Sequence, residues 1–194
     1  ILMQNIVLVS TFILLLFMGL KEKNHIYVFV VLYLTLLATA YRFTIRPDIF
    51  SLFFLTLYLF IIKKFIENKS KSILLLPLCQ LLWVNMHGFF FTGPLLVVVF
   101  LIGEIIKRTV RLPYSWNETE RLDDEQMLVL VAIFGGLILA SFVNPYGLSG
   151  AAYPFAVLGQ ISGKGKVVFE YIQELAKPMT FNNITLICNG EIYN

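Results

Sequence analysis

Long apolar runs, separated by short charged or turn-forming stretches, dominate the chain. Six such segments follow one another at residues 1–20, 26–41, 49–62, 73–84, 89–106 and 127–143. The first carries no charge and no polar stripe at helical spacing, a pattern typical of helices surrounded by lipid or by other helices. The sequence therefore predicts an all-α fold, a polytopic transmembrane helical bundle with about six membrane segments.

The lengths of the segments predict where helices break. A full crossing needs about 20 residues, so 49–62 and 73–84 are short, although 70–72 and 85–87 can extend the latter. Residues 73–106 are too long for one crossing and slightly short for two. We therefore expect a tight hairpin or a broken helix around Asn85-Met86-His87-Gly88, with a second break at Gly93-Pro94.

The composition is typical of a membrane protein and argues against nucleic acid as a partner. Hydrophobic residues make up 58% of the chain and charged residues 14%, too few charges to cover the helices of a water-soluble domain. The net charge of +3 comes from short clusters between helices, which argues for lipid as a partner and against nucleic acid. We expect a bundle over 1–147, an interfacial helical segment over 148–178 and a tail of uncertain structure over 179–194.

The distribution of basic residues predicts the orientation. If all six segments cross, one side receives Lys21, Lys23, Lys63, Lys64, Lys69, Lys71, Lys107, Arg108, Arg111 and Arg121, and the other receives Arg42, Arg46, Lys164, Lys166 and Lys177. The positive-inside rule places the first set in the cytoplasm of a multi-pass membrane protein. Three polar connectors, 42–48, 85–88 and 144–147, then share the extracytoplasmic face. This assignment depends on 73–84 crossing the membrane.

Two arginines precede the third segment and are candidates for anion binding. Arg42 and Arg46 lie four residues apart near a membrane interface, where guanidinium groups can hold phosphate oxygens or simply anchor the chain beside headgroups. Pro47 and Asp48 suit the first turn of a helix, where a carboxylate meets the positive end of the helix dipole. Asp48 is alternatively expected to pair with Arg46 and orient it.

His87 and Asn85 form a polar pair in an aromatic, apolar context. Histidine can exchange a proton near neutral pH or hydrogen-bond a sugar or phosphate oxygen, and a buried structural histidine is the alternative. The other histidine, His25, is predicted on the opposite side, and the two cysteines show no metal-ligand spacing, so no metal site is expected.

The turn Asn144-Pro145-Tyr146-Gly147 has both a structural and a functional interpretation. Asparagine before proline, followed by an interfacial tyrosine and a glycine, is typical of a helix end at the membrane surface. Because the turn is predicted on the same face as His87, Asn144 and Tyr146 are also candidates for substrate binding.

Three motifs carry a resemblance to a known family: Arg46-Pro47-Asp48-Ile49-Phe50-Ser51, Leu82-Trp83-Val84-Asn85-Met86-His87-Gly88 and Asn144-Pro145-Tyr146-Gly147. Over roughly residues 40–178 the chain resembles bacterial polytopic proteins related to the GT-C glycosyltransferases, a superfamily that includes the dolichyl-phosphate-mannose-protein mannosyltransferases. The resemblance implies a multi-pass protein of the bacterial inner membrane that transfers a sugar from a polyprenyl-phosphate donor to a glycan or protein acceptor outside the cytoplasm. Within it, Arg46 and His87 are expected to hold the donor phosphate or sugar, and no divalent metal is indicated.

One feature departs from that family. GT-C enzymes carry a catalytic acidic residue in the first outer loop, and we expect this chain to be a fragment that begins beyond it. Two other functions stay open: a transporter or flippase of lipid-linked glycans, which suits broken helices but predicts internal repeats that are not seen, and a noncatalytic membrane scaffold.

Overall fold

The computed structural model describes residues 2–21, 24–39, 47–111, 113, 116–117, 121–162, 179–181 and 184–186. Its elements are α1 (Leu2–Gly19), α2 (His25–Thr39), α3 (Asp48–Asn68), η2 (Lys71–Leu75), α4 (Leu76–Val84), η3 (Gly88–Phe91), α5 (Thr92–Thr109), α6 (Asp124–Ser141), α7 (Gly147–Ser162), β1 (Met179–Phe181) and β2 (Ile184–Leu186). The chain divides into two compact units, Ile1–Ala151 and Ala152–Asn194, which are described separately.

All six apolar segments form helices, which confirms the helical prediction. Among the described residues, four helical stretches have the length and composition to cross a membrane: α1, α3, α6 and the η3–α5 stretch Gly88–Thr109. The α2 helix and the η2–α4 stretch Lys71–Val84 are also apolar but shorter. These helices indicate a membrane protein.

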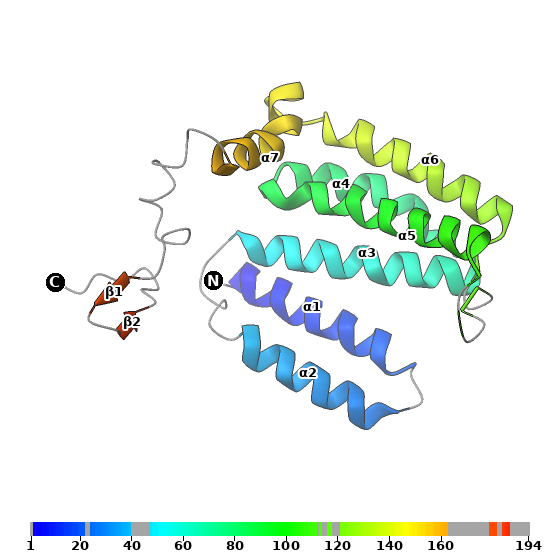
Figure 1. The fold of residues 1–194 in the computed structure, drawn as a ribbon, viewed down its shortest axis with the longest axis horizontal. Helices are drawn as coiled ribbons and strands as arrows, with labels where there is room; N and C mark the ends of the chain where they lie inside the picture. The colour runs from blue at the N-terminus through cyan, green and yellow to red at the C-terminus, as the bar shows by residue number, and fades with distance from the viewer. Residues whose placement is uncertain are drawn as a thin grey trace. The chain divides into compact units, whose positions relative to one another are not determined.

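The helices of the first unit lie side by side (Figure 1). α2 packs on α1 and α1 on α3, while α4 and α5 both contact α3 and α6. Contacts at the helix ends give the directions: Lys21, after α1, pairs with Glu67 near the end of α3 at 2.6 Å, and Lys69, after α3, pairs with Asp123 before α6. Arg108, at the end of α5, also lies beside Asp124 at the start of α6, so α1, α3 and α5 run one way, and α4 and α6 run back.

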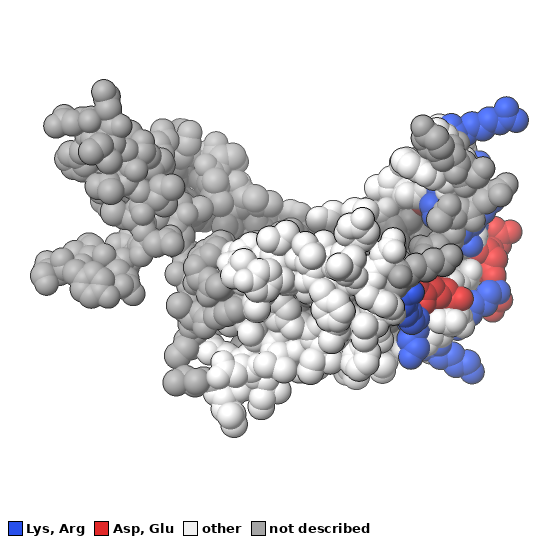
Figure 2. All heavy atoms as spheres, turned by 90° about the horizontal axis from the view of Figure 1, so that it is seen from below, with Lys and Arg blue, Asp and Glu red and all other residues white. Residues whose placement is uncertain are grey.

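Charged side chains gather at one end of this helical unit (Figure 2). Arg108 of α5 lies 2.7 Å from Asp124 and 3.3 Å from the buried Glu104. Asp123 caps α6 through a capping box in which its carboxylate accepts from the Gln126 N–H at 2.7 Å. Charges are costly in an apolar medium, so their concentration near the helix ends is what a membrane environment requires.

The exterior of the helices is apolar. Leu139 is 71% exposed, and α2 has no buried residue among those described. In water so much exposed apolar area would favour aggregation, whereas acyl chains cover it without cost. The core contains stacked and edge-packed rings: Trp83 lies 5.5 Å from both Phe54 and Tyr58, centroid to centroid.

A buried hydrogen-bond network connects α4 to α3, η3 and α6. Gln80 is fully buried, and its amide donates to the Phe90 carbonyl at 3.1 Å and to the Ser141 hydroxyl at 3.0 Å. Its side-chain oxygen accepts from the Tyr58 hydroxyl at 2.7 Å. Since unsatisfied polar groups are costly at this depth, one side chain ties α3, η3 and α6 together.

The predicted break around residues 85–88 is present. α4 ends at Val84, and His87 adopts an extended backbone, φ −156° and ψ 144°, before η3 begins at Gly88. The second break, expected at Gly93-Pro94, takes a milder form. Both residues lie in the first turn of α5, where proline sacrifices no intrahelical hydrogen bond, and the chain changes there from 3-10 to α-helical winding.

The second unit contains the end of α7 and a small hairpin. α7 carries Pro154 in its interior. β1 and β2 pair antiparallel, with Thr180 opposite Thr185, so the all-α prediction holds for the helical unit and not for this part of the tail. The interfacial segment predicted over 148–178 lies outside the described residues beyond Ser162.

Candidate functional site

The described members of the three polar connectors lie at one end of the helical unit, opposite the charged end. The Ser51 hydroxyl, in the first turn of α3, is 2.7 Å from Nδ1 of His87 in the α4–η3 turn. The Asn85 amide, in the same turn, donates to the Val143 carbonyl beyond α6 at 3.0 Å. Arg42 and Arg46 lie outside the described residues, so the predicted guanidinium clamp stays a prediction.

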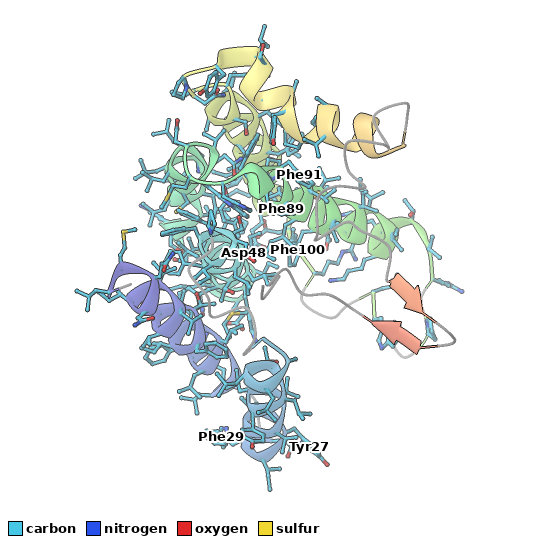
Figure 3. The ribbon with its side chains drawn as sticks, turned by 90° about the vertical axis from the view of Figure 1, so that its left-hand side faces the viewer. Tyr27, Phe29, Asp48, Phe89, Phe91 and Phe100 are labelled. Atoms are coloured by element: carbon cyan, nitrogen blue, oxygen red, sulfur yellow. The ribbon has the colours of Figure 1, made fainter. Side chains whose placement is uncertain are left out.

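His87 occupies a half-buried niche between a polar and an aromatic wall. On the polar side, Ser51 contacts Nδ1 and in turn accepts from the Trp83 indole N–H at 3.0 Å. On the aromatic side, the Phe89 ring centroid lies 5.2 Å from that of the imidazole, and Phe91 lies 6.0 Å beyond Phe89. Figure 3 views this end along the helices and labels Phe89 and Phe91, together with Asp48.

Two opposing influences set the protonation of His87. Burial disfavours the imidazolium and lowers the pKa of His87 below its ordinary value, while the Asp48 carboxylate raises it by a smaller amount. The net direction is downward. His87 is therefore neutral at pH 7, with one ring nitrogen as a donor and the other as an acceptor.

Asp48 is the first residue of α3 and is half-buried. A carboxylate in this position interacts favourably with the partial positive charge of the helix N-terminus. It is also close enough for its charge to act on His87. Its predicted pairing with Arg46 stays a prediction, because Arg46 lies outside the described residues.

The side chains of Asn85 and Asn144 hydrogen-bond to backbone groups at helix ends. The Asn85 amide also donates to the Leu81 carbonyl at 2.8 Å, so both of its N–H groups bind backbone. The Asn144 amide donates to the Ser141 and Gly147 carbonyls, each at 3.0 Å, and its oxygen accepts from the Tyr146 N–H at 2.9 Å. These contacts favour the structural interpretation of both asparagines, since their amide hydrogens are already used.

Tyr146 projects from the turn after α6 and is 78% exposed. Its backbone, not its ring, takes part in the Asn144 turn. An exposed tyrosine at a helix end suits the headgroup layer, where the ring and the hydroxyl meet different surroundings. Tyr146 thus lies at the same end as His87, on the surface of the unit.

Two members of the site, Ser51 and Trp83, were not predicted from the sequence. Ser51 follows Asp48 by three residues, which places both on one face of α3. That spacing was the available signal, although a serine in an apolar helix usually bonds back to its own backbone. Within the described part of the chain no group of three His, Cys, Asp or Glu side chains could hold a metal ion.

The site thus consists of a neutral imidazole, a hydroxyl, an indole N–H and a nearby carboxylate, bordered by phenylalanine rings. Such a set can donate to an anionic or sugar oxygen and can contact an apolar chain at the same time. Comparison with protein families, with curated proteins and with solved structures finds no match to this chain.

Proposed function

We propose a polytopic protein of the bacterial inner membrane, with six helical crossings and its charged end in the cytoplasm. The positive-inside rule supports this orientation, because the basic residues that the structure describes in the helical unit concentrate at the end opposite His87. The η2–α4 stretch would be the shortest crossing. Its 3-10 opening supports the assignment, since five residues at about 2.0 Å rise extend it by roughly 2–3 Å over an α-helix.

In this orientation, the proposed activity is glycosyl transfer from a polyprenyl-phosphate-linked sugar to a glycan or protein acceptor on the extracytoplasmic face. The observation that carries the proposal is the convergence of His87, Ser51 and Asp48 at the end opposite the ion pairs of the described residues. The motif resemblance to GT-C proteins supports the same activity.

The proposed chemistry gives each group a role at the donor phosphate. Cleavage of the bond between sugar and phosphate leaves negative charge on a phosphate oxygen, which hydrogen-bond donors stabilise. A neutral imidazole N–H from His87 and guanidinium groups from Arg42 and Arg46 would supply those donors. The Phe89 ring would face the apolar chain of the lipid. The residue that activates the acceptor hydroxyl is not assigned to this chain.

Binding of a polyprenyl monophosphate tests the donor site directly. The chain has two tryptophans, so Trp116→Phe leaves Trp83, which contacts Ser51, as the one tryptophan. In lipid nanodiscs, titration with polyprenyl monophosphate should change its emission in a saturable way. His87→Ala should weaken binding by about tenfold or more, because a hydrogen bond to a charged group is lost.

The matched control is His25→Ala, which removes the exposed histidine at the start of α2. It should leave binding unchanged. Equal affinity in the His87→Ala and parent proteins would refute the donor site. Movement of a lipid-linked glycan across proteoliposome membranes without a new glycosidic bond would favour a flippase over a transferase.

A further inference from the structure

The Ser51 hydroxyl lies between the ring nitrogens of Trp83 and His87, and this position determines which of the three groups donate hydrogen bonds and which accept them. The Trp83 indole nitrogen lies 3.0 Å from Ser51 Oγ, and His87 Nδ1 lies 2.7 Å from the same oxygen. An indole N–H can only donate, so one lone pair of the Ser51 oxygen is used by Trp83. The remaining contact, with His87, decides the tautomer of the imidazole.

We propose that Ser51 and Trp83 are positioning residues that hold His87 as a neutral imidazole with its proton on Nε2, so that Nε2–H is presented as a donor to a phosphate oxygen. The identity of the ligand rests on the proposed function; the tautomer does not. With Nδ1 as acceptor, Ser51 gives its single hydrogen to His87 and receives that of Trp83. The Trp83 N–H, the Ser51 hydroxyl and His87 Nδ1 are then all satisfied.

The opposite tautomer fits less well. A proton on Nδ1 would give Ser51 two incoming N–H donors and leave its own hydrogen in need of another acceptor in a half-buried place. It would also leave Nε2 as an acceptor, which cannot bind a fully ionised phosphate. Hydrogen bonds donated from Trp83 to Ser51 and from Ser51 to His87 therefore leave Nε2–H of His87 as the donor for a ligand.

The same geometry argues against Ser51 as a nucleophile. A serine that attacks a substrate uses an oxygen lone pair, and the Trp83 N–H draws electron density from that oxygen. The hydrogen bond would weaken as the oxygen became an ester, so it would oppose the reaction. Ser51 is better suited to orienting His87, as the outer-shell partners of other histidines do.

Few charges face the imidazole from the elements packed around it. In α3 the charged group that acts on His87 is Asp48. η3 contributes Gly88, Phe89, Phe90 and Phe91, and the end of α4 contributes Trp83 and Val84, none of which is ionised at neutral pH. The tautomer is thus set mainly by the hydroxyl and the indole, because within the described residues Asp48 is the charge that acts on the ring.

Nitrogen NMR can read the tautomer, because the chain has two histidines. The full chain, labelled with ring-15N histidine in nanodiscs, gives one signal pair for His25 and one for His87, and His25→Ala assigns them. The proposal predicts an unprotonated Nδ1 and a protonated Nε2 for His87 at pH 7. Ser51→Ala should shift the tautomer ratio toward Nδ1–H by roughly five- to tenfold, about the effect of one hydrogen bond.

Ser51→Thr keeps the hydroxyl and should keep the parent tautomer, while Trp83→Phe keeps a ring against Phe54 and should weaken the preference. A protonated Nδ1 in the parent protein, or an unchanged ratio in Ser51→Ala, would overturn the proposal.

Titration with polyprenyl monophosphate separates this proposal from the proposed function. If Ser51→Ala shifts the tautomer and also weakens binding, both stand. If the tautomer shifts while no variant binds the lipid phosphate differently, the positioning role stands and the proposed donor site is wrong. If binding depends on His87 but not on Ser51, the positioning role is overturned and the donor site survives.

Discussion

At the scale of single residues, Gly93 shows how closely the helices approach. A Cβ built on Gly93 would lie 2.7 Å from Gln80 Oε1, 3.0 Å from Tyr58 Cε1 and 3.2 Å from Trp83 Cζ3. Gln80 cannot easily withdraw, because its amide is bonded to Phe90 and Ser141. A glycine here therefore permits the contact between α5 and the Gln80 network.

Gly93→Ala should lower the stability of the protein by about 1–3 kcal/mol, the usual cost of an overpacked core. The matched control lies on the same helix: a Cβ added to Gly103 would meet nothing within 4 Å, so Gly103→Ala should be neutral or stabilising by up to about 1 kcal/mol. Thermal unfolding in detergent, followed by tryptophan emission, compares them. Equal melting temperatures for the two variants would contradict the close approach.

Gln80 offers a second test at the residue scale. Gln80→Leu keeps the volume but leaves the Phe90 carbonyl without the bond that Gln80 supplies, whereas Tyr58 and Ser141 keep contacts to the Leu76 and Leu137 carbonyls. Loss of one buried bond should cost about 1–2 kcal/mol. The same melting assay measures it, and a variant as stable as the parent would show that the network contributes little.

Some residues of the candidate site can be predicted from the sequence, and others cannot. A histidine beside a predicted helix break is unusual in an apolar run, which makes His87 a candidate from the sequence, and the structure gives it a polar partner. Asn85 is a candidate for the same reason, but its amide donates to the backbone carbonyls of Leu81 and Val143. Ser51 and Trp83 were missed because their contact joins residues 32 positions apart, which depends on how α3 and α4 pack.

At the scale of elements, apolar runs predicted where helices exist better than where they end. The segment predicted at 49–62 is the helix Asp48–Asn68, because Lys63, Lys64 and Glu67 continue the winding past the apolar run. Lys69 then ends it in a left-handed conformation, φ 50°, that no hydrophobic pattern indicates. Charged residues at the end of this apolar helix therefore continue its winding instead of stopping it.

The start of α6 gives a pH-dependent prediction. Hydrogen bonds from Lys69 and from the Gln126 N–H lower the pKa of Asp123 below its ordinary value. A carboxylate with a lowered folded-state pKa stabilises the fold above the unfolded-state pKa, about 4, and this contribution is lost as pH falls through the folded value.

Asp123→Asn should therefore melt at a lower temperature than the parent at pH 7, and the difference should shrink as the pH drops below about 4. Lys69→Met, which removes the cation of the same pair, provides the matched comparison. Adding Asp123→Asn to Lys69→Met should change the melting temperature less than Asp123→Asn does alone. A difference that persists unchanged at low pH would contradict the role of the Asp123 charge.

At the scale of the whole molecule, the two ends of the helical unit differ in kind. One end holds the ion pairs among Lys21, Glu67, Arg108 and Asp124 (Figure 2), and the other holds the His87 niche. Periodicity and charge counting predicted this separation, because antiparallel neighbours return each second connector to the same end. They could not predict the hydrogen bonds that shape the niche, which depend on side-chain packing.

Cysteine labelling in intact cells tests the central claim that the His87 end lies outside the cytoplasm. In the full chain with Cys79→Ala and Cys188→Ser, single cysteines replace Met86 and Tyr146 at one end and Lys71 and Trp116 at the other, all exposed positions. A membrane-impermeant maleimide should label Met86→Cys and Tyr146→Cys before lysis, and Lys71→Cys and Trp116→Cys only after permeabilisation. Labelling of Met86→Cys and Lys71→Cys from the same side would show that residues 71–84 do not cross, and would contradict the proposed site.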